Sequence, residues 1–197
     1  MKNPLYANRG TAFEMFIGFA NDQYAKDKVA IIQKIPTEFI PIRDRYGKVC
    51  TVKVEKKSTV DFMGRYKQYP IAIEAKETKS GSIRFDAVQQ HQAAFLDAFT
   101  AQEGVIGIIL IAFDLKRFYA VPWAFWSDAY RLRVMRNDKT TETTIKHHGQ
   151  TWKIPKKYSL REDELLPEWR VPGNAVSVGL NYLKNVENYI TKKENDI

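Results

Sequence analysis

The chain has 197 residues, of which 44% are hydrophobic, and its formal net charge is +8. That length and apolar content allow a buried core, which excludes an intrinsically disordered chain. Excess positive charge is typical of proteins that bind phosphate-rich partners, although a basic soluble protein without such a partner has the same composition. The single cysteine, Cys50, excludes an internal disulfide and favours a reducing cytoplasm. No apolar run reaches the length of a membrane span and the N-terminus has no signal-peptide pattern, so we expect a cytoplasmic protein.

The N-terminal part of the chain is predicted to be a flexible polar arm followed by a helix. The arm covers residues 1–10, and we expect residues 11–197 to form a single domain. Thr11 and Glu14 have the spacing of a capping box, which predicts that the helix begins at Thr11. A short apolar segment over residues 29–32 is predicted to be a buried strand.

The remaining elements predict a mixed sheet flanked by helices, and thus an α/β protein. In chain order they are a hairpin at about 37–57 that turns near Gly47, two acidic segments around Asp61 and Glu74, a helix over 86–102 with Asp86 as its N-cap, strands over 105–113 and 117–121, a short aromatic helix after Pro122, a polar hairpin through His148 and a helix over 179–190. The strand over 105–113 is apolar throughout, which indicates that both of its faces are covered.

The segment around Glu74 combines acidic and basic side chains with an apolar strand. Side chains alternate across a strand, so Glu74 and Lys76 share one face while Ile71, Ile73 and Ala75 occupy the other. By the same alternation Glu77 points away from Lys76. A carboxylate and an ammonium on one face of an apolar strand suit a divalent cation held against a phosphate.

Asp61 precedes this strand at an interval that allows its carboxylate to lie beside Glu74 on a neighbouring strand. Hydrolysis of a phosphodiester needs an activated water and stabilised negative charge, and a carboxylate-bound Mg²⁺ supplies both. Lys76 is suited to orient the water and to stabilise the developing charge. An acid followed by Glu-x-Lys also occurs by chance on surface strands, so the pattern alone has low specificity.

Several motifs in the same order resemble the RecU-type Holliday-junction resolvases. They are Asn8-Arg9-Gly10, Ser58-Thr59-Val60-Asp61, Glu74-Ala75-Lys76-Glu77-Thr78-Lys79 and His91-Gln92. The resemblance covers about residues 8–130, and the Glu-Ala-Lys-Glu-Thr-Lys run is its most specific part. A further segment from Ser159 to Leu165 is similar to one near the family's C-terminus.

This resemblance implies a homodimeric, Mg²⁺-dependent endonuclease with a restriction-endonuclease-like core, for which Mn²⁺ can substitute. It implies metal ligands at Thr59, Asp61 and Glu74 together with a glutamine, and a transition-state lysine at Lys76. Gln92 matches the glutamine best, although its spacing from Glu74 is one residue shorter than in the family and Gln89 and Gln90 are close by. Thr59 has an alternative role as an ordinary strand residue.

Glu14 is a further candidate for a catalytic role, because related nucleases use an acid on the first helix. Its capping-box spacing with Thr11 explains it equally well.

DNA binding is expected at two basic regions. The first is the hairpin, which resembles the family's protruding stalk and carries Arg43, Arg45, Tyr46, Lys48, Lys56 and Lys57. Its cations suit phosphates, and Tyr46 suits stacking on an unpaired base or, alternatively, a structural role. The second is the arm, where Arg9 lies in the Asn-Arg-Gly motif.

The leading hypothesis is a bacterial or phage-encoded resolvase of four-way DNA junctions, with a recombinase or a branch-migration helicase as a further partner. Two nicks related by a twofold axis favour a homodimer. One alternative is a nuclease of the same core that cuts forks, flaps or duplex DNA. Another is a DNA-binding recombination accessory without catalysis, against which the intact acids and lysine argue.

Overall fold

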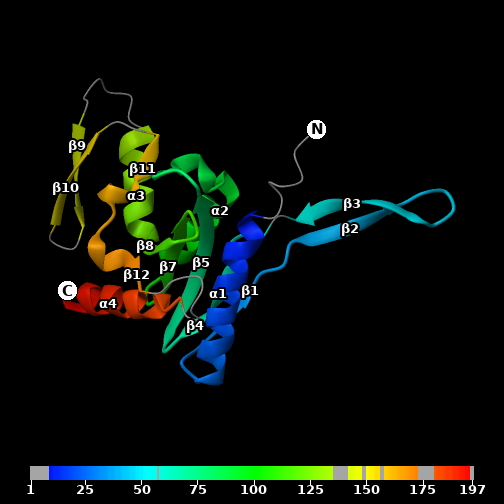
Figure 1. The fold of residues 1–197 in the computed structure, drawn as a ribbon, viewed down its shortest axis with the longest axis horizontal. Helices are drawn as coiled ribbons and strands as arrows, with labels where there is room; N and C mark the ends of the chain where they lie inside the picture. The colour runs from blue at the N-terminus through cyan, green and yellow to red at the C-terminus, as the bar shows by residue number, and fades with distance from the viewer. Residues whose placement is uncertain are drawn as a thin grey trace.

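A six-stranded mixed β-sheet forms the centre of the protein (Figure 1). The computed structural model describes residues 9–56, 58–134, 142–147, 150–155, 158–172 and 180–195. In spatial order the strands are β1 (Ala30–Lys34), β4 (Phe62–Tyr66), β5 (Tyr69–Thr78), β7 (Ile106–Phe113), β8 (Arg117–Pro122) and β12 (Arg170–Val171). β5 and β7 run parallel, which requires a crossover connection, and the other neighbours in this sheet are antiparallel.

Helices cover both faces of the sheet. On one face α1 (Arg9–Lys26) and α4 (Tyr182–Asn195) supply Phe13, Ile17 and Leu183 to one apolar cluster. On the other face α2 (Gln90–Thr100) and α3 (Trp123–Val134) contribute Leu96 and Trp126 to a second cluster. All residues of β7 are buried between these two layers, as its uninterrupted apolar sequence predicts.

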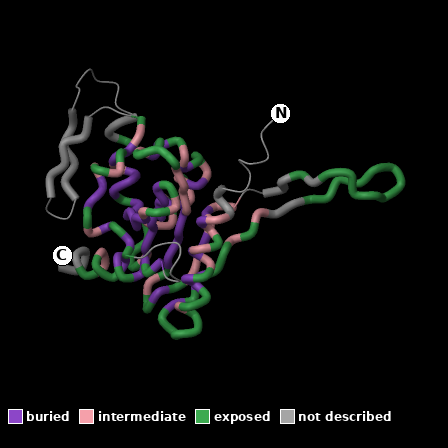
Figure 2. The backbone as a smooth tube through the Cα atoms, viewed as in Figure 1, coloured by how far each residue is buried: buried purple, intermediate pink, exposed green. Residues whose placement is uncertain are grey.

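The hairpin projects away from this body and pairs only with itself among the described strands (Figure 1). It consists of β2 (Glu38–Arg43) and β3 (Val49–Lys56), and Figure 2 shows that it is exposed along most of its length. At its tip the amide of Gly47 donates to the carbonyl oxygen of Asp44, and Gly47 has a φ of 80°. A left-handed backbone is unstrained at glycine, so this residue allows the chain to reverse.

Smaller elements complete the described structure. They are the strand pairs β6 (Ser82–Arg84) with β11 (Ser159–Arg161) and β9 (Glu142–His147) with β10 (Gln150–Pro155), and the 3₁₀ turns η2 (Phe85–Ala87), η3 (Glu162–Glu164) and η4 (Pro167–Trp169). No helix within the described residues is long and apolar enough to cross a bilayer.

The structure confirms the predicted mixed sheet flanked by helices and the protruding hairpin. Two predicted helix starts are wrong. α1 begins at Arg9, so Thr11 lies within the helix and cannot be its N-cap. α2 begins at Gln90, because Asp86 belongs to η2 and its carboxylate accepts hydrogen bonds from the guanidinium of Arg84.

Two other predictions concern segments that are only partly described. Residues 1–8 of the predicted arm lie outside the described residues, and Arg9 and Gly10 belong to α1. The single domain expected over 11–197 stays a prediction.

Candidate active site at the free edge of strand β5

Strand β5 divides its side chains between the two layers as the alternation predicts. Ile71 and Ile73 belong to the apolar cluster of α1, whereas Ala72 belongs to that of α2 and α3. Glu74 continues the series that points toward α2, and its side chain has no exposed surface. A carboxylate in an apolar layer is costly unless it has partners or binds a cation.

The edge of β5 is unpaired beyond Ile73, and Asp61 covers it. β4 pairs with β5 only from Tyr69 to Ile73, because the chain bends away before Phe62. The amide of Ala75 instead donates to the carboxylate of Asp61 over 2.8 Å. The carbonyl oxygen of Asp61 accepts a hydrogen bond of 2.8 Å from the amide of Ile35, just beyond β1. Asp61 is therefore fixed from both sides and lies beside Glu74.

The carboxylate of Glu74 has unequal surroundings at its two oxygens. Oε1 lies 2.5 Å from the ammonium of Lys76 and accepts a hydrogen bond of 2.6 Å from the side-chain amide of Gln92. Oε2 is buried and has no hydrogen-bond partner in the structure as described. Burial first, and the nearby charge of Asp61 second, raise the pKa of Glu74 to about 8, and the opposing effect of Lys76 is smaller.

Gln92 is the glutamine that the fold brings to this site. It lies in the first turn of α2, where its Oε1 accepts hydrogen bonds from the amide of Gln89 over 2.9 Å and from Lys76 over 3.3 Å. Gln89 and Gln90 are exposed and line a different pocket between α2 and α3. The contact between Gln92 and Glu74 therefore distinguishes it from its two neighbours.

A cavity of about 450 Å³ opens beside Asp61 and Lys76. Glu14 lines it from α1, and the Lys34 ammonium lies 2.7 Å from the carboxylate of Glu14. Burial is the main cause of the raised pKa of Asp61, and the charge of Glu14 raises it further. The sequence reading missed Lys34, whose only signal is a polar residue at the end of an apolar strand.

Glu77 also lines this cavity, although by the alternation along β5 it lies on the opposite face of the strand from Lys76. Residues 74–78 have no β4 neighbour, and both faces of this part of β5 therefore border the open edge.

The acids fit a magnesium ion better than a softer metal. No group of three or more His, Cys, Asp or Glu side chains suited to a metal occurs within the described ranges. Mg²⁺ is commonly held by one or two carboxylates, with water and substrate phosphate completing its shell. Asp61 and Glu74 provide two adjacent carboxylates, and the buried Oε2 of Glu74 lacks any other partner. The donor set is therefore compatible with Mg²⁺.

Thr59 does not lie in a strand, contrary to its alternative interpretation. It belongs to the bend before β4, two residues from Asp61, and is not among the described residues that line the cavity.

The predicted DNA-binding residues at the tip of the hairpin lie apart from the cavity. Arg43 ends β2, while Arg45, Tyr46 and Lys48 occupy the exposed turn of the projecting hairpin (Figure 2). Lys57 and the side chains of Arg9 and Lys56 fall outside what the structure describes.

Comparison with known proteins agrees with the motif order. Residues 8–163 match the model of the family described as recombination protein U. The chain belongs to the recombination protein U family. It is 32% identical over 133 residues to the Holliday junction resolvase RecU of Streptococcus mutans, covering 64% of this chain and 68% of that protein. It is 34% identical over 131 residues to the RecU of a Streptococcus pneumoniae strain, covering 58% and 66%.

A likeness among solved structures is weaker. The Holliday junction resolvase Hjc of Archaeoglobus fulgidus superimposes with a TM-score of 0.35 and 11% identity, covering 76% of this chain and 93% of that one.

Proposed function

We propose that this member of the recombination protein U family is an endonuclease that resolves four-way DNA junctions in recombination and repair. The names of its relatives support the substrate. The observation that carries the proposal is the convergence of Asp61, Glu74 and Lys76 at the open edge of β5, beside a cavity that a phosphate can enter. Two carboxylates and an ammonium in this arrangement suit phosphodiester hydrolysis.

The proposed cofactor is Mg²⁺, which Mn²⁺ can replace. Asp61 and Glu74 would hold it, with Glu14 close enough to take part from α1. When bound, the ion would lower the pKa of a water molecule and stabilise charge on the phosphate. Lys76 would face the same phosphate. Thr59 would contribute through its backbone carbonyl, since it lies two residues before Asp61 in the chain.

Gln92 takes a more specific role in this proposal than that of a simple ligand. Its amide group donates to Glu74, and its Oε1 already accepts two hydrogen bonds. Gln92 would therefore orient Glu74, and would need to turn its amide over to present an oxygen to the ion.

DNA would be held by the hairpin and by the N-terminal motif. Arg43, Arg45 and Lys48 would contact phosphates near the junction centre, with Tyr46 stacked on a base. Lys56, Lys57 and Arg9 would extend this contact. Contacts to phosphates do not read the base sequence, so the protein would select its DNA by the shape of the junction.

Assembly and location complete the proposal. A homodimer would place one site on each of two strands related by a twofold axis, so that paired nicks resolve the junction. A recombinase or branch-migration helicase would supply the junction in the bacterial cytoplasm.

The test is the cutting of a labelled four-way junction and of a duplex of the same sequence, with Mg²⁺, with Mn²⁺ and with a chelator. We expect symmetric nicks in the junction that require a divalent ion, and much slower cutting of the duplex. Equal cutting of the duplex, or preference for a fork or flap, would redirect the proposal to another substrate. Tight junction binding without cutting would support a non-catalytic accessory instead.

A further inference from the structure

Two of the cations around the cavity are paired with carboxylates, and a third is not. Glu74 pairs with Lys76, and Glu14 pairs with Lys34. Lys79 lines the cavity at its rim, and its exposed ammonium forms no ion pair with any residue in the described part of the chain. The carboxylates of Asp61 and Glu77 also line this space, so Lys79 is the lining cation that remains available to a phosphate among the described residues.

The backbone that carries Lys79 is tied into a compact loop. The hydroxyl of Thr78 donates to the carbonyl oxygen of Ser82 over 3.1 Å and accepts a hydrogen bond of 3.2 Å from the amide of Ser80. The hydroxyl of Ser80 donates to the same carbonyl over 2.6 Å. Two hydroxyl groups thus close the loop around Lys79 from within.

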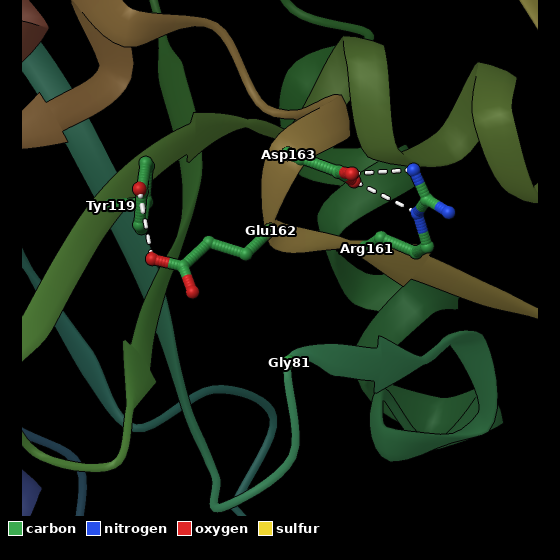
Figure 3. A pocket seen from close by; sticks show the side chains of 5 residues that line it. All are labelled: Gly81, Tyr119, Arg161, Glu162 and Asp163. Atoms are coloured by element: carbon green, nitrogen blue, oxygen red, sulfur yellow. Dashed lines mark hydrogen bonds and ion pairs between the residues drawn. The ribbon is translucent and has the colours of Figure 1, made fainter.

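A segment far away in the sequence holds this loop from outside. The amide of Glu162 donates to the carbonyl oxygen of Gly81 over 2.9 Å, and β11 pairs with β6 directly after the loop. Figure 3 shows that Gly81 faces the segment of Arg161 and Glu162 across a shared pocket. Tyr119 lines the same pocket from β8.

The side chain of Glu162 fixes this segment to the central sheet. Its Oε1 accepts hydrogen bonds from Arg117 over 2.7 Å and from the hydroxyl of Tyr119 over 3.0 Å, both on β8. The loop of Lys79 is therefore connected to the rigid sheet through Glu162, which lies near the end of the region matched by the family model.

We propose that Lys79 binds a DNA phosphate that flanks the one being cut, and that Glu162 is a positioning residue that holds the Lys79 loop against the cavity. This inference rests on the proposed function for its substrate. Three extended residues span at most about 10 Å, so Lys79 reaches a phosphate next to that held at Lys76. A cation carried by a loop that is held at this place favours one register of the DNA strand across the acids.

The first experiment measures binding of a four-way junction without divalent ions over a range of salt concentrations. Lys79→Met should weaken binding severalfold at low salt and lower the slope of log affinity against log salt by about 0.9, the value for one phosphate contact. Lys79→Arg should restore both. The matched control, Lys26→Met, removes an exposed lysine at the far end of α1 and should change neither.

The second experiment tests the positioning role by a double-mutant cycle. In a Glu162→Ala background, Lys79→Met should lower affinity by a smaller factor than in the wild-type protein, because the loop no longer holds Lys79 in place. Asp163→Ala removes an exposed carboxylate of the same turn and should leave the effect of Lys79→Met at its full size. An equal effect in the Glu162→Ala background would overturn the positioning role.

The two proposals fail in different ways. A wild-type protein that binds the junction but never cuts it refutes the proposed function and leaves the Lys79 measurement valid. A wild-type protein that cuts, with an unchanged salt slope after Lys79→Met, refutes the inference alone.

Discussion

At the tip of the hairpin Arg45 and Lys48 are exposed to solvent, whereas the carboxylate of Glu74 in the cavity has no exposed surface. At this tip the carboxylate of Asp44 accepts hydrogen bonds from the backbone amides of Tyr46 and Lys48. In the cavity, by contrast, the carboxylates of Glu14 and Glu74 each lie within 2.7 Å of a lysine ammonium. Exposed charges act through their number and are weakened by salt, while buried charges act through individual positions and pKa values. One region is thus suited to bind and the other to react.

The largest expected effect is the loss of cutting after substitution in the cavity. Glu74→Gln, Asp61→Ala or Lys76→Ala should each reduce Mg²⁺-dependent cutting by at least about 100-fold, because each removes a group at the reacting phosphate. Junction binding should survive, since the hairpin is untouched. Asp163→Asn, an exposed acid outside the cavity, is the control. Normal cutting rates measured for any of the three variants would remove that residue from the chemistry.

A second prediction concerns the hairpin, where substitution should weaken DNA binding and leave the cutting chemistry intact. Replacing Arg45 and Lys48 together by Gln should weaken junction binding and lower the salt slope by about 1.8. Cutting at saturating DNA should remain metal dependent. Arg43 is kept because its guanidinium donates to the carbonyl oxygen of Gly47 and supports the turn.

The control for the hairpin is Lys26→Gln with Lys184→Gln, which changes the net charge equally on α1 and α4. If the control pair lowers the slope as much as the hairpin pair, the effect comes from overall charge, and the contrast between the two regions is lost.

The smallest effect is a dependence of stability on pH that belongs to the cavity alone. The pKa of Glu74 is about 8 in the folded protein and near its ordinary value of 4.5 when unfolded. The folded state therefore binds more protons between these values, and the free energy of unfolding should fall as pH rises from 6 to 8, by up to about 2 kcal/mol.

The measurement is denaturant unfolding with a chelator at both pH values. Glu74→Gln cannot release this proton and should lack that part of the decrease. Adding Mg²⁺ should stabilise the wild-type protein more at pH 8 than at pH 6, because the carboxylate is then free to bind. A wild-type protein and a Glu74→Gln variant with the same pH dependence would show that Glu74 is ionised throughout.

The parts of the site that the sequence predicts are those that depend on local periodicity. The alternation along β5 correctly places Glu74 and Lys76 together, and the turn residues correctly place the hairpin. The burial of β7 follows from its unbroken apolar sequence. In each case the signal lies within a few neighbouring residues.

The parts that the sequence could not predict depend on contacts between distant segments. Lys34 meets Glu14 only because β1 packs beside α1, and Glu162 meets Gly81 only because β11 returns to β6. The N-cap predicted at Asp86 failed for a local reason instead, because Arg84, two residues away, binds that carboxylate. Local propensity is a weak guide where a nearby or tertiary partner competes for the same group.

The hairpin lies in the chain between the end of β1 and Asp61. Its first strand, β2, begins three residues after Ile35, and the amide of Ile35 donates a hydrogen bond to the carbonyl oxygen of Asp61. If the tip of the hairpin binds at the crossover of a junction, the hairpin would hold the catalytic acids at a set distance from the branch point. The position of the cut, counted in nucleotides from the branch point, would then depend on the length of β2 and β3 and not on the base sequence.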